Sequence, residues 1–105
     1  MRKITEELCT AFEQGKAKTK GNTKTDGKSL YLHGNEIARK HKGALYISDG
    51  GFKSRTTKER LNGLKGVHIQ QKAFVWYLNG IEWDKWPEAK KAYTVFGGTR
   101  VFLKV

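Results

Sequence analysis

The sequence predicts an α+β fold: a small antiparallel β-sheet, built as a meander and hairpins, with an N-terminal helix and one or two short helices. Three observations support this prediction. Apolar residues recur at helical spacing near the N-terminus, they alternate with polar residues through the middle of the chain, and turn signals separate the alternating segments. Because 105 residues of 37% hydrophobic composition can bury one modest core, we expect residues 1–105 to form a single domain.

The first segment has the pattern of an amphipathic helix. Ile4, Leu8 and Phe12 recur at intervals of four residues, and Ala11 lies on the same stripe. Gly15 follows them and is a suitable C-terminal stop.

Residues 16–28 are the most polarised part of the chain. Five lysines stand against one aspartate, and no apolar residue there is larger than Ala17. Since such a segment supplies nothing to a core, we expect a solvated basic loop or mobile arm. It is either a charged loop without a ligand or a phosphate-binding segment, for which lysine is suited as a flexible point charge.

Residues 29–48 change to a period of two. Leu30 and Leu32 alternate with Tyr31 and His33, a Gly–Asn turn signal follows at 34–35, and the chain turns again near residue 43. This pattern predicts a three-stranded antiparallel meander. An Asp-Gly-Gly break ends it, and we expect residues 52–55 to form a short extension.

The clearest local signature follows this break. Thr56, with Glu59 three residues later, fits a capping box, in which the two side chains satisfy backbone donors at a helix start. Leu61 and Leu64 would anchor the short helix that it opens.

The last third of the chain is again strand-like, with segments 67–71 and 73–78 rich in β-branched and aromatic residues. Asn79-Gly80 is a strong hairpin signal that returns the chain into 81–83. Pro87 suits the first turn of a short helix, and the segments 94–96 and 99–103 indicate a closing hairpin. We expect the core around the second hairpin to hold three tryptophans, Trp76, Trp83 and Trp86.

The charge of the chain points to its partners. Lys and Arg total 21 against 10 Asp and Glu, a net charge of +11. A compact domain this basic repels itself, and a polyanionic partner, most commonly nucleic acid, is the simplest explanation of such a surplus. The alternative is that the charge only keeps the protein dispersed.

No motif of the sequence indicates catalysis. The spacing of His33, His41 and His68 suits no common metal site, and the single Cys9 gives no zinc cluster. A P-loop, a nucleophile elbow and a pair of glycosidase-like acids are also absent from the sequence. We therefore expect a non-enzymatic protein without metal or cofactor.

The cellular compartment follows from the same composition. Cys9 allows no internal disulfide, lies in the amphipathic stretch as a small core residue, and fits a reducing compartment. The sequence has no apolar run near the ~20 residues of a membrane span and no signal-peptide pattern. We expect a cytosolic protein that does not engage membranes.

The basic groups fall into three clusters that are candidates for phosphate contact. Lys58 also lies near the start of the capping-box helix, where backbone donors favour an anion, unless Thr56 and Glu59 already satisfy those donors. The clusters are Lys16, Lys18, Lys20, Lys24 and Lys28; Arg39, Lys40, His41 and Lys42; and Lys53, Arg55, Lys58 and Arg60.

Aromatic residues interleave with these basic groups in the meander. If Leu30 and Leu32 point to the core, Tyr31 and His33 face the other way, and Tyr46 shares that outer face. Such a face would stack unpaired bases, each worth roughly 1–3 kcal/mol. The alternative is that a helix covers this face and the tyrosines belong to the core.

The run Gly21-Asn-Thr23, then Leu30-Tyr-Leu-His-Gly-Asn35 with Ile37-Ala38, resembles small proteins encoded by tailed bacteriophages. The same is true of Thr56-Thr-Lys-Glu-Arg-Leu-Asn-Gly63 and of Trp76-Tyr-Leu-Asn-Gly80 with Trp83. The resemblance covers residues 11–83, and the tail beyond Trp83 does not fit the pattern. It implies a phage gene product that acts in the cytoplasm of the infected cell, and it carries over no catalytic residues.

The sequence therefore leads us to expect a basic phage protein that binds DNA or RNA mainly through phosphates and with low sequence specificity. Arginine, the usual reader of guanine, is far outnumbered by lysine, and no recognition-helix motif is present. The main alternative is an inhibitor that docks on a host defence or nucleic-acid-processing protein, and a minor virion protein is a third class.

Overall fold

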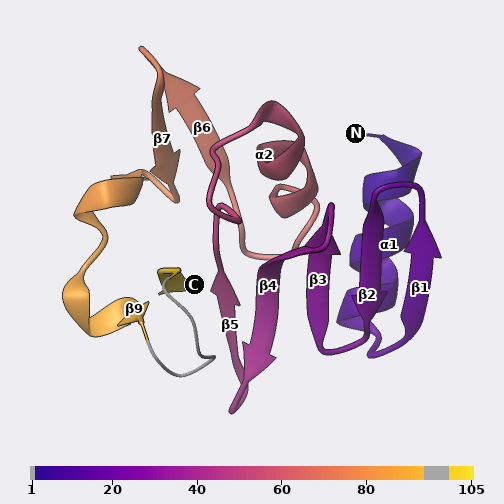
Figure 1. Ribbon diagram of the computed structural model, residues 1–105. Coiled ribbons are helices and arrows are strands. Elements are labelled where there is room, and N and C mark those ends of the chain that lie inside the picture. Colours follow the sequence, from indigo (N-terminus) through magenta and orange to yellow (C-terminus); the bar gives the residue numbers. More distant parts are fainter. Residues whose placement is uncertain (1, 94–99) are drawn as a thin grey trace.

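The computed structural model describes residues 2–93 and 100–105, which form the α+β fold that the sequence predicts. Helix α1 spans Lys3–Glu13 and helix α2 spans Arg55–Leu61, and the strands form two antiparallel sheets (Figure 1). The large sheet has the order β1-β2-β3-β4-β5-β10-β9, namely Ala17–Lys20, Thr23–Asp26, Ser29–Leu32, Asn35–His41, Ala44–Ile47, Phe102–Lys104 and Lys91–Ala92. The small sheet has the order β6-β7-β8, namely Ile69–Lys72, Val75–Leu78 and Ile81–Glu82, and the 3-10 helices η1 and η2 span Trp83–Lys85 and Glu88–Lys90.

Helix α1 is confirmed, together with its glycine stop. Leu8, Ala11 and Phe12 are buried. Gly15 has a φ of +72°, its N–H donates to the Phe12 carbonyl at 3.1 Å, and the N–H of Lys16 donates to the Ala11 carbonyl at 2.8 Å. These two bonds form a Schellman motif, which satisfies carbonyl groups that the last helical turn leaves without partners.

Residues 16–28 correct the sequence analysis, because they form the strands β1 and β2 instead of a loop or mobile arm. Thr23 and Thr25 of β2 are buried, whereas Lys24 and Asp26 are exposed. The buried hydroxyls are satisfied: Thr23 donates to the Asn22 side chain at 2.8 Å and Thr25 donates to the Ser29 carbonyl at 2.7 Å. Alternating β-branched threonines fit a half-buried strand although they are not apolar.

The meander of residues 29–48 is confirmed as β3, β4 and β5. Leu30, Leu32 and Ile47 point to the core. The register shifts between Leu30 and Tyr31, which is the mark of a β-bulge, and this shift explains why the neighbours Ile37 and Ala38 of β4 are both buried.

Helix α2 is present, but it begins earlier than the predicted capping box. Its N-cap is Ser54, whose Oγ accepts a hydrogen bond from the N–H of Thr57 at 3.1 Å. Thr56 lies inside the first turn, and the Glu59 carboxylate instead accepts hydrogen bonds from Thr5 and Arg60. Residues 52–55 do not extend the meander, because residues 52–54 lead into this helix and Arg55 is its first residue.

The two helices approach each other closely beyond the end of α2. A Cβ atom on Gly63 would lie 2.5 Å from Thr5 Cγ2 and 2.8 Å from Cys9 Sγ. Only glycine therefore fits at this position, and the contact fixes the chain after α2 against α1.

The small sheet has the predicted Asn79–Gly80 turn between β7 and β8. As expected, the three tryptophans are buried, and the rings of Trp76 and Trp83 meet edge to face with centroids 5.4 Å apart. A short helix follows Pro87, as predicted, in the form of η2. Residues 94–99 of the predicted closing hairpin lie outside the described residues, and β10 pairs with both β5 and β9.

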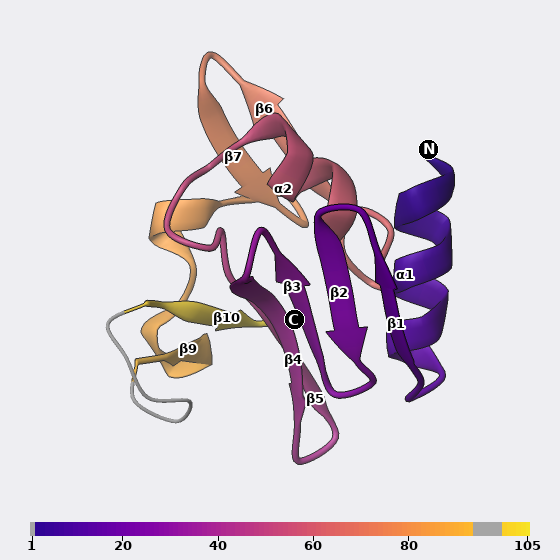
Figure 2. The same ribbon diagram turned by 45° about the vertical axis from the view of Figure 1, so that its right-hand side comes forward.

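Helices α1 and α2 lie on the same face of the large sheet. Helix α1 contacts β1, β2 and β3, and α2 contacts α1 and β4. Figure 1 shows α1 behind β1 and β2, Figure 2 shows it lying against β1 at the side of the sheet, and in Figure 1 no helix of the described residues lies in front of β2 to β5. We call the face of β1 to β5 and β10 opposite to the helices the open face.

Candidate nucleic-acid interface

The open face presents aromatic and basic side chains on neighbouring strands. Cross-strand pairing places Lys24 of β2 beside Tyr31 of β3, and Arg39 of β4 beside Tyr46 of β5. Partners in an antiparallel pair point to the same face. Both tyrosines are half-buried, so part of each ring is accessible, and no helix among the described residues covers them. The two tyrosines and their basic neighbours therefore share one face of the sheet, as the alternation of the sequence predicts.

The charges of the open face are mixed. Arg39 Nε donates to the Glu36 carboxylate at 2.6 Å, and this partner raises the pKa of Arg39. The Asp26 carboxylate accepts the backbone N–H groups of Ser29 at 2.8 Å and Lys28 at 2.9 Å, which lowers the pKa of Asp26. Both acids of this face are thus engaged by groups of the protein, and their negative charge is partly compensated. The ring of His41 contacts Tyr46 edge to face, with centroids 6.2 Å apart.

Three exposed lysines, Lys16, Lys28 and Lys42, lie at one end of the large sheet. We call them the basic end. Lys16 directly precedes β1, Lys28 lies in the β2–β3 turn, and Lys42 lies in the β4–β5 turn. The first two segments touch, because a Cβ atom on Gly27, at φ +90°, would lie 2.5 Å from the Gly15 carbonyl group. Within the described residues, none of the three ammonium groups has an ion-pair partner.

Lys40 belongs to the structure of this end and is not one of its exposed charges. Its ammonium group donates to the Phe12 carbonyl at the end of α1 and to the Gly27 carbonyl at 3.2 Å. It also lies 4.6 Å from the centroid of the Phe12 ring. Lys40 thus ties α1 to the β2–β3 turn, and its proposed role in phosphate contact is corrected.

Arg60 is a second correction to the candidate residues. It is 2% exposed, and its guanidinium group donates to Thr23 at 2.9 Å, to Thr5 at 2.8 Å and to the Glu59 carboxylate at 2.6 Å. A phosphate cannot reach this group. Its burial could not be predicted from the sequence, because arginine is rarely buried without such a set of partners.

Lys18 and Lys20 point away from the open face. Their cross-strand partners are Thr25 and Thr23, which face α1. Lys20 Nζ lies 2.5 Å from the Glu7 carboxylate of α1, and this bond lowers the pKa of Glu7. The five lysines of residues 16–28 are therefore divided between two faces and one end of the sheet.

The remaining candidates are dispersed. His33 is exposed at the end of the sheet opposite to the basic end, with its ring 3.5 Å from the Asn22 amide. Near α2, Lys53 pairs with Asp49 at 3.0 Å, Arg55 is exposed, and Lys58 donates to Gln71 at 3.1 Å. These groups and the open face do not form one continuous basic surface.

The structure adds Lys104, which the sequence analysis did not select. It pairs across strands with Tyr46 and is exposed on the open face. The alternation of residues 102–104 could have indicated its orientation, but not that β10 lies beside β5.

A metal centre finds no support in the described ranges 2–93 and 100–105, where no group of three or more potential ligands is arranged to hold an ion. In the same ranges, no helix has the length and apolar character needed to cross a membrane.

Comparison with known proteins identifies a family. The family model described as "Kyanoviridae Gp96 protein" matches residues 1–98. The match therefore extends through residues 84–98, part of the tail beyond Trp83 that the sequence resemblance had excluded. No curated protein and no solved structure matches the chain at the threshold of the comparison.

Proposed function

This chain belongs to the Kyanoviridae Gp96 protein family, a family of phage proteins, and we propose that it binds nucleic acid without catalysis in the cytoplasm of the infected cell. The observation that carries the proposal is the open face with its adjoining basic end. Half-buried tyrosines and exposed lysines lie there together, and no helix of the described residues covers them.

The chemistry of the open face suits a single strand better than a specific duplex site. Tyr31 and Tyr46 offer ring surface on which unpaired bases stack, and Lys24 and Lys104 offer ammonium groups for phosphates. The three lysines of the basic end offer further ammonium groups for phosphates at the adjoining end of the sheet. Base-specific readout is not expected, since Arg39, the arginine of this face, is bound by Glu36.

The salt dependence of binding tests the proposal. We expect fluorescence anisotropy to report binding to an oligothymidylate that weakens steeply between about 50 and 200 mM salt. A Lys24→Gln, Lys28→Gln, Lys42→Gln triple variant should bind more weakly, with a log–log salt slope about 2 units flatter, because each lost single-strand contact contributes about 0.7.

The matched control removes the same charge elsewhere. Lys65, Lys85 and Lys90 are exposed and lie outside the large sheet, so the corresponding triple glutamine variant should leave the slope nearly unchanged. Equal losses in both variants would show that only net charge matters and would contradict an interface on this face.

A second candidate function is docking on a host protein, and large exposed apolar side chains favour it. Phe52 is 75% exposed and Phe74 is 94% exposed. A protein interface with a packed apolar centre should respond weakly to salt. If the oligonucleotide does not bind, this candidate becomes the leading one, and a pull-down from host lysate at high salt is the next measurement.

A further inference from the structure

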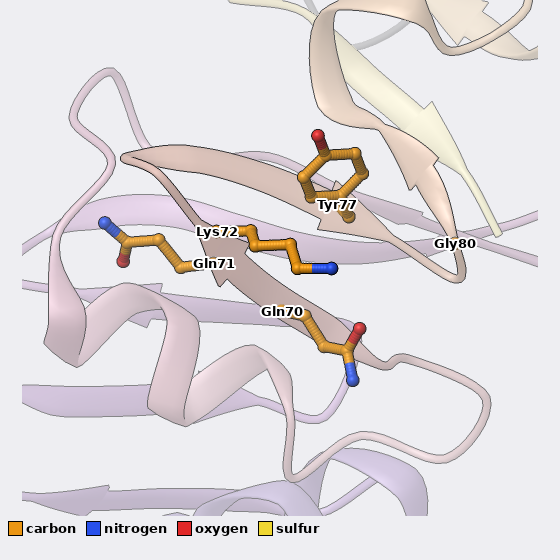
Figure 3. A pocket seen from close by; sticks show the side chains of 5 residues that line it. All are labelled: Gln70, Gln71, Lys72, Tyr77 and Gly80. Carbon is orange, nitrogen blue, oxygen red and sulfur yellow. The ribbon is translucent and has the colours of Figure 1, made fainter.

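The face of the small sheet that carries Tyr77 is a second surface with the chemistry of a nucleotide site. The open hollow on this face measures about 690 Å³ and is lined by Gln70, Gln71, Lys72, Tyr77 and Gly80. Figure 3 shows Gln70 and Lys72 reaching to the side on which Tyr77 lies, whereas Gln71 points the other way. Cross-strand pairing agrees, because Gln70 lies directly opposite Tyr77.

The polar groups that converge on this hollow have no partners in the part of the chain that the structure describes. The Gln70 amide, the Lys72 ammonium group and the Tyr77 hydroxyl make no hydrogen bond or ion pair there. Gln71, by contrast, accepts a hydrogen bond from Lys58 at 3.1 Å. A planar ring, an amide and a cation thus lie on one face of the small sheet and remain available to a ligand.

Charge decides the class of ligand. The chain contains no aspartate or glutamate from residue 60 to residue 81, although this stretch holds the whole hairpin of β6 and β7. The nearest acid on this face is Glu82, opposite Tyr77, and it is paired with Lys85 at 3.4 Å. An anionic ligand is therefore favoured over a basic peptide.

The tip of the hairpin adds a second aromatic surface. Ala73 and Phe74 form the turn between β6 and β7 with φ values of +50° and +67°. Turns of this kind favour Asn–Gly, and a bulky residue at positive φ is strained. The chain nevertheless holds the Phe74 ring 94% exposed at this position. Strain of this kind is typical of functional sites.

We propose that this face binds one unpaired nucleotide of a nucleic-acid strand. The base stacks on Tyr77, its edge meets the Gln70 amide, and a phosphate lies on Lys72. Gln70 and Lys72 are two residues apart on one strand, about 7 Å, which is comparable to the span from base to phosphate within a nucleotide. The Phe74 ring at the tip receives the neighbouring base. This inference rests on the proposed function, since it takes the partner to be nucleic acid.

The test compares two probes that share a backbone. One is an oligothymidylate of about ten nucleotides, and the other is an abasic strand of the same length. We expect Tyr77→Leu to weaken binding of the oligothymidylate about tenfold and to leave binding of the abasic strand unchanged, because the lost contact is a base stack. Tyr77→Phe keeps the ring and should bind like the original protein. Phe52→Ala removes an exposed aromatic ring elsewhere and is the control.

Lys72→Gln provides a variant whose folding is not in question, because its side chain is exposed on β6. It should flatten the log–log salt slope by about 0.7 on both probes. The control variant, Lys90→Gln, should leave the salt slope unchanged on both probes.

The outcomes separate this inference from the function on which it rests. If the unaltered protein binds neither probe at low salt, both are overturned. If it binds both, and Tyr77→Leu and Lys72→Gln match their controls, the nucleotide site is overturned while the proposed function stands. A loss for Tyr77→Leu that is equal on both probes also overturns the stacking role.

Discussion

Arg60 is the residue whose role differs most between sequence and structure. Its guanidinium group is buried beneath α2 and joins three parts of the chain, since it bonds Thr5 of α1, Thr23 of β2 and Glu59 beside it. A buried charge is tolerated only when its partners replace the lost hydration. Arg60 therefore fixes how α2 sits on the rest of the fold.

Arg60→Ala should lower the free energy of unfolding by about 3 kcal/mol, because the change leaves buried hydroxyls and a carboxylate without their donor. Arg55→Ala is the control in the same helix, and its exposed side chain should matter by less than about 0.5 kcal/mol. Urea unfolding followed by tryptophan fluorescence measures both. A loss below about 1 kcal/mol for Arg60→Ala would show that the network does not stabilise the fold.

Cys9 is the buried thiol between α1 and α2. It is 2% exposed, and its Sγ donates to the Arg60 carbonyl at 3.3 Å. Burial, and to a smaller extent the nearby Glu13 and Glu59 carboxylates, raises the pKa of Cys9 from 9.0 to about 12. The thiol is therefore protonated and unreactive in the folded protein at neutral pH.

The raised pKa of Cys9 makes stability depend on alkaline pH. The thiol ionises first in the unfolded chain, so its contribution is complete below pH 9.0 and is lost as the pH rises toward about 12. The free energy of unfolding is measured against pH for the protein and for Cys9→Ala. The difference between them isolates this effect from the lysines and tyrosines that ionise in the same pH range. If the free energies of unfolding of the two proteins change equally over this pH range, the raised pKa of Cys9 is contradicted.

The hairpin of β6 and β7 shows the cost of placing an aromatic ring at a turn. Ala73 and Phe74 both have positive φ, which costs of order 1 kcal/mol or more for residues other than glycine and asparagine. The hairpin is otherwise well supported, since Trp76 and Leu78 of β7 are buried in the core.

Replacing Ala73-Phe74 by Asn-Gly should raise the free energy of unfolding by about 1 kcal/mol, because both residues accept this turn without strain. The same change should weaken oligothymidylate binding if Phe74 contacts a base. Denaturant unfolding and anisotropy measure the two effects. A variant that gains stability and keeps full binding would show that the exposed ring serves another purpose.

The elements with short-range signals could be predicted from the sequence. The α1 stripe with Gly15 and the Asn79–Gly80 turn each depend on neighbouring residues alone. The first turn of the meander was placed one residue too late, because it lies at His33–Gly34 and Asn35 already begins β4. The strands β1 and β2 were not predicted, because the buried face of β2 consists of threonines. A polar, lysine-rich segment indicates a loop unless its alternation is given more weight than its composition. The capping residue Ser54 was missed because Thr56 and Glu59 fit the better-known spacing.

The candidate site was predictable in part. The orientation of Tyr31 and Tyr46 followed from alternation, but the burial of Arg60 and the bonds of Lys40 depend on contacts 13 to 55 residues away in sequence. The Gln70, Lys72 and Tyr77 face had no sequence signal, because its residues become neighbours only through the hairpin register.

The molecule as a whole carries a net charge of +11 within 105 residues, and seven ion pairs join its described side chains. Repulsion among the remaining cations opposes folding. Salt screens this repulsion, with a Debye length near 10 Å at about 0.1 M. The same screening weakens attraction to phosphates, so stability and binding should respond to salt in opposite directions.

Thermal unfolding at NaCl concentrations from about 20 to 200 mM tests this balance. We expect the melting temperature to rise by several degrees over this range while nucleic-acid affinity falls. The Lys65, Lys85 and Lys90 triple glutamine variant should show a smaller rise, because it has less repulsion to screen. A melting temperature that falls with salt would mean that the ion pairs outweigh the repulsion.

The position of β1 at the edge of the sheet gives its two lysines a role that does not involve a nucleic-acid partner. This strand ends the order of the large sheet, and all four of its residues are exposed, two of them lysines. A terminal strand offers unpaired backbone groups that another chain can join, and protruding lysines oppose that joining through repulsion. Lys18 and Lys20 therefore oppose the pairing of this strand with the sheet edge of another molecule.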